Sequence, residues 1–233
     1  DRNFLLKTCY RIIFNSNWSK NRFMESIDNK FINSEKFKVC FQSASKGNIN
    51  FIPKKKKWIT FVGKLNKAKG YDVFGKSIIK VLKKNPGWRG KIVGDEKREK
   101  IDFNHKQLDK LGFIQHDKVL SLYKKSSIAV VCSRWEEPFG RTSLEAAANG
   151  NAVIISNKGG LPETITNGII LRNLNINETT RELEKLINNK NQREKLQKLS
   201  IKNFFLTHRY VSNLIDNYRD EKLQKINFFN IKR

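Results

Sequence analysis

Short apolar runs alternate with amphipathic segments along the chain from residue 58 onward. Six of the runs have the length and the apolar content of buried strands, and they lie at residues 59–65, 91–94, 112–114, 128–133, 152–156 and 168–171. Between the first two runs, Phe74, Ile78 and Val81 follow the spacing of one helix face, and residues 85–87 (Asn-Pro-Gly) end that helix. Further helices are predicted around residues 119–123, 183–187 and 196–199. This alternation favours right-handed βαβ crossovers and therefore an α/β fold with a Rossmann-like parallel sheet.

The first fifty residues follow a different pattern. Residues 11–16 and 37–41 each predict a short strand, and a helix is predicted from Ser19 between them. A polar loop, residues 42–50, separates this region from the alternating pattern that follows.

The segment from Glu137 to Glu145 carries the most informative chemistry. It follows the strand-like run at 128–133 and passes through a Pro-Phe-Gly turn into an Ala-rich helix. A strand, a tight turn and a helix in succession direct backbone N–H groups and the positive helix end at an anion. Glu145 lies about one and a half turns into the helix, and Glu137 precedes the turn, so both carboxylates can reach the same space. An anionic ligand with hydroxyl groups, such as a sugar nucleotide, fits this arrangement.

Composition narrows the classes of protein. At 233 residues the chain is long enough for a substantial core, and no apolar run approaches the roughly 18 residues of a membrane-spanning helix. The formal charge of +25 indicates an anionic partner, including a membrane surface, or else the Lys-, Asn-, Ile- and Phe-rich usage of an AT-rich genome. A nucleic-acid role is not expected, because the chain has no zinc-finger, basic-zipper or RNA-binding strand signature.

Metal and disulfide chemistry find little support in the sequence. The three cysteines are far apart and form no Cys-x-x-Cys, which favours a reducing, cytoplasmic compartment. The three histidines have no metal-ligand spacing, and the chain has no Asp-x-Asp. No metal and no cofactor are expected.

Five motifs in order resemble the retaining, family-four glycosyltransferases of GT-B fold. Residues 137–145 resemble the Glu-x7-Glu motif of that family. The other four matching segments are 61–70, 91–95, 111–114 and 152–163. The likeness extends from about residue 57 to residue 218. It implies the donor-binding C-terminal half of a GT-B enzyme, with most of the N-terminal domain missing from these residues.

The resemblance also implies a domain organisation. Residues 1–50 are expected to be a remnant of the N-terminal acceptor domain with its linker, and residues 51–205 the nucleotide-sugar-binding domain. Residues 206–233 resemble a C-terminal helix, beginning near Phe204, that crosses back to the first domain. By itself this piece is expected to bind donor but to transfer little or no sugar.

Roles for individual residues follow from the same resemblance. Lys64 and Lys69 match the two basic positions that bind the diphosphate, although the family usually has Arg at the first. Glu137 matches the position that contacts donor-sugar hydroxyls. These three residues are expected to be catalytic. The two lysines act through their charge, because cations aimed at the leaving phosphate stabilise the negative charge that develops there.

The remaining site residues are expected to bind the donor. Glu145 matches the acceptor of the ribose hydroxyls. Main-chain N–H groups are expected to face phosphate and sugar at Phe139, Gly140, Arg141 and Thr142. Gly63 ends the first strand of the domain, and Ile114 belongs to the loop that holds the base. Arg141 departs from the aliphatic residue usual in the family.

The function implied is metal-independent transfer of a hexose-type sugar, with retention, from a nucleotide diphosphate to a lipid-linked or polysaccharide acceptor. Such an enzyme would belong to cell-envelope polysaccharide biosynthesis, in the cytoplasm or at the inner face of the membrane. Glucosyl transfer of the starch or sucrose type would share Glu137 and Glu145. A basic anion-binding module without catalysis remains the alternative from a different class.

Overall fold

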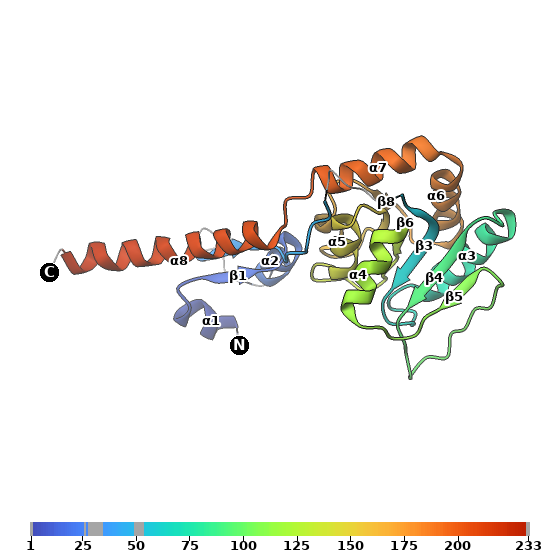
Figure 1. The fold of residues 1–233 in the computed structure, drawn as a ribbon. Coiled ribbons are helices and arrows are strands. Elements are labelled where there is room, and N and C mark those ends of the chain that lie inside the picture. The colour runs from blue at the N-terminus through green and yellow to red at the C-terminus, as the bar shows by residue number, and fades with distance from the viewer. Residues whose placement is uncertain (1, 26, 28–34, 49–53, 232–233) are drawn as a thin grey trace. The chain divides into compact units, whose positions relative to one another are not determined.

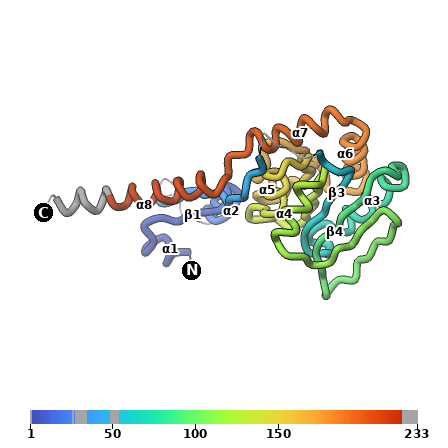
Figure 2. Tube along the Cα trace, in the orientation of Figure 1, coloured from blue at the N-terminus to red at the C-terminus, as the bar shows by residue number. Residues whose placement is uncertain are grey.

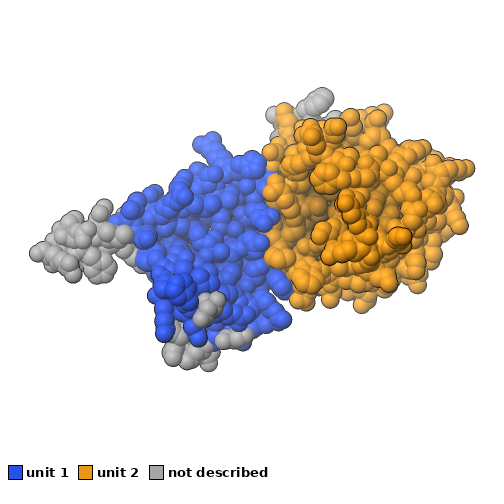
Figure 3. Space-filling view, turned by 90° about the horizontal axis from the view of Figure 1, so that it is seen from below, with its two compact units in different colours: residues 1–44, 205–233 blue, residues 45–204 orange. Residues whose placement is uncertain are grey.

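The computed structural model describes residues 2–25, 27, 35–48 and 54–231, with side chains described up to residue 223. The chain divides into two compact units (Figure 3). The larger consists of residues 45–204, and the smaller combines residues 1–44 with residues 205–233. Among the described helices, none combines the length and the apolar character needed to cross a membrane.

The larger unit is built on a parallel six-stranded sheet, which confirms the predicted α/β fold. Its strands are β3 (Lys56–Val62), β4 (Arg89–Val93), β5 (Leu108–Lys110), β6 (Ser126–Val131), β7 (Ala152–Ser156) and β8 (Ile169–Leu171). They are arranged in the order β5-β4-β3-β6-β7-β8, with Ile59 of β3 opposite Ile128 of β6. The order therefore reverses between β3 and β6, and such a reversal opens a ligand-binding crevice at the carboxyl ends of the two strands.

Helices cover both faces of this sheet (Figure 1). They are α3 (Tyr71–Lys84), α4 (His116–Lys125), α5 (Arg141–Ala148), α6 (Ile176–Asn188) and α7 (Lys190–Lys202), with a short 3-10 helix, η2 (Leu161–Thr164). The helices α3 and α6 lie side by side (Figure 2) and pack on one face. The opposite face packs against α4 and α5.

Alternate residues of each central strand supply these two layers. Ile128 and Val130 belong to the hydrophobic cluster under α3 and α6, whereas Ala129 packs with α4 and α5. Every residue of β7 is buried, as expected for a strand covered on both faces. Strands of this kind give continuous apolar runs, which explains why the sequence located β6 and β7 closely.

The predicted strand at residues 112–114 is wrong. The third strand of the unit is β5, which ends at Lys110, and the apolar residues after it form a turn. Gly112 has φ 63°, a left-handed conformation that does not continue a strand, and its carbonyl accepts from Gly94 N at 2.9 Å. The turn leaves the Phe113 side chain 78% exposed.

The smaller unit pairs two short parallel strands, β1 (Ile12–Phe14) and β2 (Phe37–Val39). It also contains the helices α1 (Arg2–Thr8), α2 (Asn17–Met24) and α8 (His208–Ile231). Arg11 connects the strand region to α8, because it forms an ion pair with Glu221 at 2.7 Å and donates to the Tyr218 carbonyl. The predicted strands are therefore present but shorter. The helix α2 begins at Asn17 rather than at Ser19, because the Ser16 hydroxyl accepts from an N–H group of its first turn. The helix α8 begins at His208 rather than near Phe204, because Thr207 does the same there.

Candidate active site

Two adjoining cavities open at the carboxyl edge of the sheet, beside the reversal of strand order. The first has a volume of about 400 Å³ and the second about 210 Å³. Both are lined by Val62, Gly63, Arg141 and Thr142, which form a common wall. A parallel α/β sheet of this order is expected to bind its ligand at this place.

The wall is made from the end of β3 and the start of α5. Gly94 fixes the neighbouring loop, since its φ is 132° and a Cβ there would lie 1.8 Å from the Gly63 carbonyl oxygen. At the other side, Gly140 precedes α5 with φ 119°, so that no side chain covers the first turn of the helix. The first N–H groups of a helix lack intrahelical partners and carry partial positive charge. An anion in the shared part of the two cavities would therefore face them.

Glu145 lies in the first cavity and is almost fully buried, with a side-chain exposure of 6%. Its Oε1 accepts from Arg141 Nε at 2.6 Å and lies 2.8 Å from Nε2 of His116, the first residue of α4. One carboxylate oxygen is thus fixed by two cationic or hydrogen-bonding side chains. The helix position predicted for Glu145 is the one the structure has, because α5 begins at Arg141.

Glu137 and Lys69 line the second cavity and form an ion pair. Lys69 is placed by the loop after β3, where its backbone N donates to Asn66 Oδ1 at 2.9 Å. Glu137 is placed by a loop contact, since its carbonyl accepts from Gly160 N at 2.7 Å. The pair brings together two residues that lie 68 positions apart in the sequence. Lys64 lines the first cavity rather than this one.

Cys132 adjoins the second cavity region but offers no nucleophile. It is fully buried under the start of α3, where its thiol donates to the Gly70 carbonyl at 3.2 Å. Burial raises the pKa of this thiol to about 12, so the reactive thiolate does not form near neutral pH.

Residues 43–203 match the family model described as "Glycosyl transferases group 1". The chain belongs to this family. The match covers the whole sheet of the larger unit and both cavities, and it confirms the resemblance on which the sequence interpretation depends.

Several curated proteins and solved structures are similar to this chain. Spore coat protein SA of Bacillus subtilis is 29% identical over 187 residues, which are 72% of this chain and 50% of that protein. The lipopolysaccharide core biosynthesis mannosyltransferase LpsB of Rhizobium meliloti is 26% identical over 147 residues, or 59% of this chain and 42% of that one. The chain thus spans half the length, or less, of these curated relatives.

Solved structures show the same fold. The crystal structure of Anabaena HepE in complex with UDP-glucose superposes with a TM-score of 0.76 at 17% identity, covering 94% of this chain and 66% of that one. Together with the parallel sheet described above, this likeness confirms the fold expected for the C-terminal domain of a GT-B group 1 glycosyl transferase.

Most residues that the sequence singled out line the two cavities. Gly63, Lys64, Ile114, Arg141, Thr142 and Glu145 line the first, and Lys69, Glu137 and Gly140 line the second. Phe139 lines neither, since its side chain is 1% exposed and lies in the core. The role predicted for Phe139 concerns its main chain and stays a prediction, as do the roles of the others.

The sequence interpretation missed His116 and Asp95 as lining residues of the first cavity. Asp95 directly follows the predicted strand end at Gly94, and that position was a usable signal. His116 had no such signal, because its proximity to Glu145 depends on how α4 packs beside α5. Among the described residues, no group of three or more His, Cys, Asp and Glu side chains is placed to hold a metal ion.

Proposed function

We propose that the larger unit binds a nucleotide-diphosphate sugar and belongs to an enzyme that transfers a hexose-type sugar with retention. The observation that carries the proposal is the pair of adjoining cavities, the first lined by Glu145 and the second by Glu137, with the start of α5 between them. Nucleoside and sugar are the two hydroxyl-bearing parts of such a donor, and the diphosphate joins them. The two cavities and the wall between them offer groups for these three parts in the same order.

The nucleoside is assigned to the first cavity. Its apolar wall includes Val93, Ile114 and Val119, which suit the face of a base. Glu145 accepts hydrogen bonds from the ribose, because an ionised carboxylate has only acceptor oxygens and its Oε2 accepts no hydrogen bond from the described residues. Family membership supports this assignment, since Glu145 stands at the second position of the Glu-x7-Glu motif.

The diphosphate is assigned to the shared wall and the sugar to the second cavity. The N–H groups at the start of α5 and the ammonium groups of Lys64 and Lys69 supply positive potential on either side of the wall. Charge that develops on the phosphate as the glycosidic bond breaks is stabilised by such fixed dipoles and cations. Glu137 receives the sugar hydroxyls, and its ion pair with Lys69 holds it in place before donor binds.

Donor and acceptor classes are proposed from relatives. UDP-glucose is the first donor to test, because the structurally similar HepE was crystallised with it. A lipid-linked or polysaccharide acceptor, in the synthesis of the cell envelope, agrees with the lipopolysaccharide relative. Residues 51–205 would form the donor domain, and residues 1–50 and 206–233 would belong to the acceptor domain and its returning helix. No metal takes part in this proposal, and the reaction takes place in the cytoplasm or at the inner membrane face.

Calorimetric titration of the chain with UDP-glucose, GDP-mannose, ADP-glucose and dTDP-glucose, with chelator present, tests the proposal. We expect saturable binding of one of them. In Glu145→Gln the affinity falls about tenfold or more, because a hydrogen bond to a charged group contributes about 1.5–3 kcal/mol. The control is Glu136→Gln, which changes an exposed carboxylate that lines neither cavity.

The alternative, an anion-binding module without catalysis, is favoured by the charge of +25. It predicts binding of any polyanion that weakens steeply with salt and that is unchanged in Glu137→Gln with Glu145→Gln. Equal affinity for the sugar nucleotide in that double variant and in Glu136→Gln would contradict the donor-site assignment.

A further inference from the structure

A third cavity, distinct from the donor site, lies at the opposite edge of the sheet. It has a volume of about 550 Å³, within the range of small-molecule sites. It is lined by the start of β3, by Ser127 of β6 and by one face of α7. The seven residues of β3 separate it from Gly63 by about 20 Å, at 3.3 Å per residue. Nothing in the donor chemistry requires it.

The lining of this cavity is strongly basic. We define the basic cavity by its nine lining residues, which are Lys54, Lys55, Lys57, Ser127, Lys190, Arg193, Glu194, Gln197 and Lys198. Six of them are basic and one is acidic. Some cations elsewhere on the larger unit are paired with carboxylates, as Arg134 is with Asp72 and Lys84 with Glu184. Among the described residues, the ion pair found within this lining joins Glu194 to Lys190, at 3.9 Å.

Two of the basic groups form a fixed floor. Lys55 donates to the carbonyls of Tyr123 and Asn149, at 2.9 and 2.6 Å. Arg193 is buried, donates to the Leu186 and Ile187 carbonyls and stacks over a tryptophan ring. These side chains are held in place by the fold. Lys54, Lys57 and Lys198 around them are exposed, and no ion pair to them is found in the described part of the chain.

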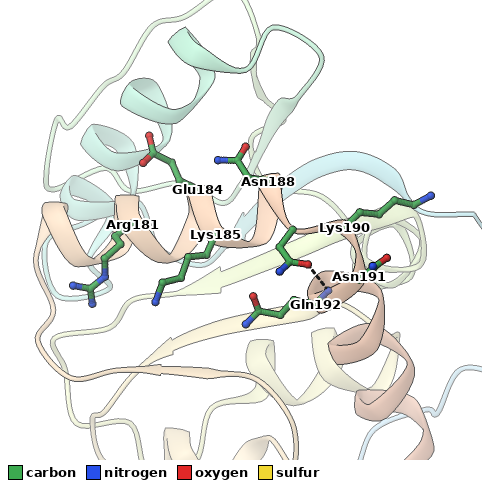
Figure 4. A pocket seen from close by; sticks show the side chains of 8 residues that line it. Arg181, Glu184, Lys185, Asn188, Lys190, Asn191 and Gln192 are labelled. Carbon is green, nitrogen blue, oxygen red and sulfur yellow. Dashed lines mark hydrogen bonds between the residues drawn. The ribbon is translucent and has the colours of Figure 1, made fainter.

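Converging like charges destabilise a fold unless a counter-charge offsets them. The neighbouring hollow at the corner of α6 and α7 shows the contrast. Its polar side chains point apart in Figure 4, and Asn189 Oδ1 is already bonded to Gln192 N. Arg181 and Lys185 of that hollow both pair with Glu182. Of these two cavities, the basic cavity is the one whose described lining residues include an excess of cations without an ion pair.

We infer that the basic cavity binds clustered phosphate groups, carried either by a soluble polyphosphate or by the headgroups of an anionic membrane. Several ammonium groups around one hollow suit several phosphate oxygens, since each ammonium offers three donors and no acceptor. Glu194, Gln197 and Ser127 complete a polar lining, which suits a hydrated ligand.

The test compares two variants of the full chain that lose the same charge. In the cavity variant four lysines become glutamine, namely Lys54, Lys57, Lys190 and Lys198. In the control variant the exposed lysines changed to glutamine are Lys76, Lys83, Lys106 and Lys202, which line none of the described cavities. All eight side chains are exposed, so both variants are expected to keep the circular dichroism spectrum and the UDP-glucose affinity of the parent chain.

Two probes distinguish the source of phosphate. Inorganic tripolyphosphate is titrated calorimetrically, and vesicles of phosphatidylcholine with 30% phosphatidylglycerol are used in a sedimentation assay. We expect at least a tenfold loss of affinity for one or both probes in the cavity variant and less than a twofold loss in the control variant. Loss with tripolyphosphate alone assigns a soluble ligand, and loss with vesicles alone assigns the membrane.

Equal losses in the two variants, or no saturable binding of either probe, would overturn the inference. Because the donor site is tested separately with UDP-glucose, that outcome would leave the proposed donor function unaffected.

Discussion

The two carboxylate oxygens of Glu145 differ in their contacts, because His116 and Arg141 both contact Oε1. The His116 side chain is slightly less exposed than that of Arg141, at 54% against 62%. His116 belongs to α4, whereas Arg141 belongs to the same helix as Glu145. His116 therefore couples the position of α4 to the orientation of the proposed ribose acceptor.

We expect His116→Ala to weaken UDP-glucose binding about fivefold. A partly exposed hydrogen bond that orients a carboxylate contributes about 1 kcal/mol, and its loss frees the Glu145 side chain. Calorimetry measures the effect, with His105→Ala as control, since His105 lines neither donor cavity. Unchanged affinity in His116→Ala would mean that Arg141 alone orients the carboxylate.

Lys55 makes the stability of the chain depend on pH. Burial lowers the pKa of its amine to about 7, whereas an unfolded lysine titrates near 10.4. Between these values the unfolded chain binds more protons, so the free energy of unfolding rises with pH. Relative to Lys55→Gln, the parent chain should gain up to about 1.4 kcal/mol per pH unit from pH 7 to 10.

Urea unfolding of the parent chain and of Lys55→Gln at pH 7, 8 and 9 measures this difference. The matched control is Lys57→Gln, which removes an exposed lysine of the same cavity. If the parent chain and Lys55→Gln change in parallel with pH, the Lys55 amine is not titrating in this window.

At the scale of elements, the loops that follow the strands position the side chains of the site. The geometry of these loops depends on a few places where a glycine lies against a neighbouring backbone. Gly70 precedes α3 with φ 69°, and a Cβ there would lie 1.7 Å from the carbonyl oxygen of Cys132. Lys69 immediately before it is thereby held beside the second cavity.

Gly70→Ala should lower the free energy of unfolding by more than about 2 kcal/mol, because left-handed strain and a backbone clash act together. Gly112→Ala is a matched control, since Gly112 has φ 63° but open space around its missing Cβ. That variant should lose about 1 kcal/mol. Urea unfolding compares the two, and equal losses would show that the approach to Cys132 is unimportant.

Strands buried on both faces were predictable from sequence, as was the apolar edge strand β8, whereas the polar edge strand β5 was not. The strands β6 and β7 are continuous apolar runs, because helices cover both of their faces. The edge strand β5 contains Asp109 and Lys110, and this polar composition does not predict a strand, whereas the apolar residues of the turn after it do. The motif residues of the site were placed by family resemblance, but the contact of His116 with Glu145 depends on tertiary packing that no local pattern encodes.

At the scale of the molecule, the chain divides into two units, and the site described here belongs to the larger one. Both donor cavities and both hydrophobic clusters consist of residues from 45–204. A unit with its own core is expected to fold independently.

Residues 45–204 expressed alone should therefore fold and bind UDP-glucose with an affinity within about twofold of the full chain. Circular dichroism and calorimetry measure both properties, with Glu145→Gln in the same shortened chain as the control for specific binding. An unfolded product, or binding more than tenfold weaker, would show that the smaller unit supports the donor site.

The common wall of Val62, Gly63, Arg141 and Thr142 also separates the two halves of the proposed donor. Because nucleoside and sugar are assigned to different cavities, the loop at residues 111–115, which lines the first, and the loop at residues 132–140, which lines the second, would set base and sugar selectivity independently. An exchange of the first loop with that of a relative would retune base preference, and an exchange of the second would retune sugar preference. A scaffold of this kind can change its preference for the base or for the sugar separately, while the common wall between the two cavities stays the same.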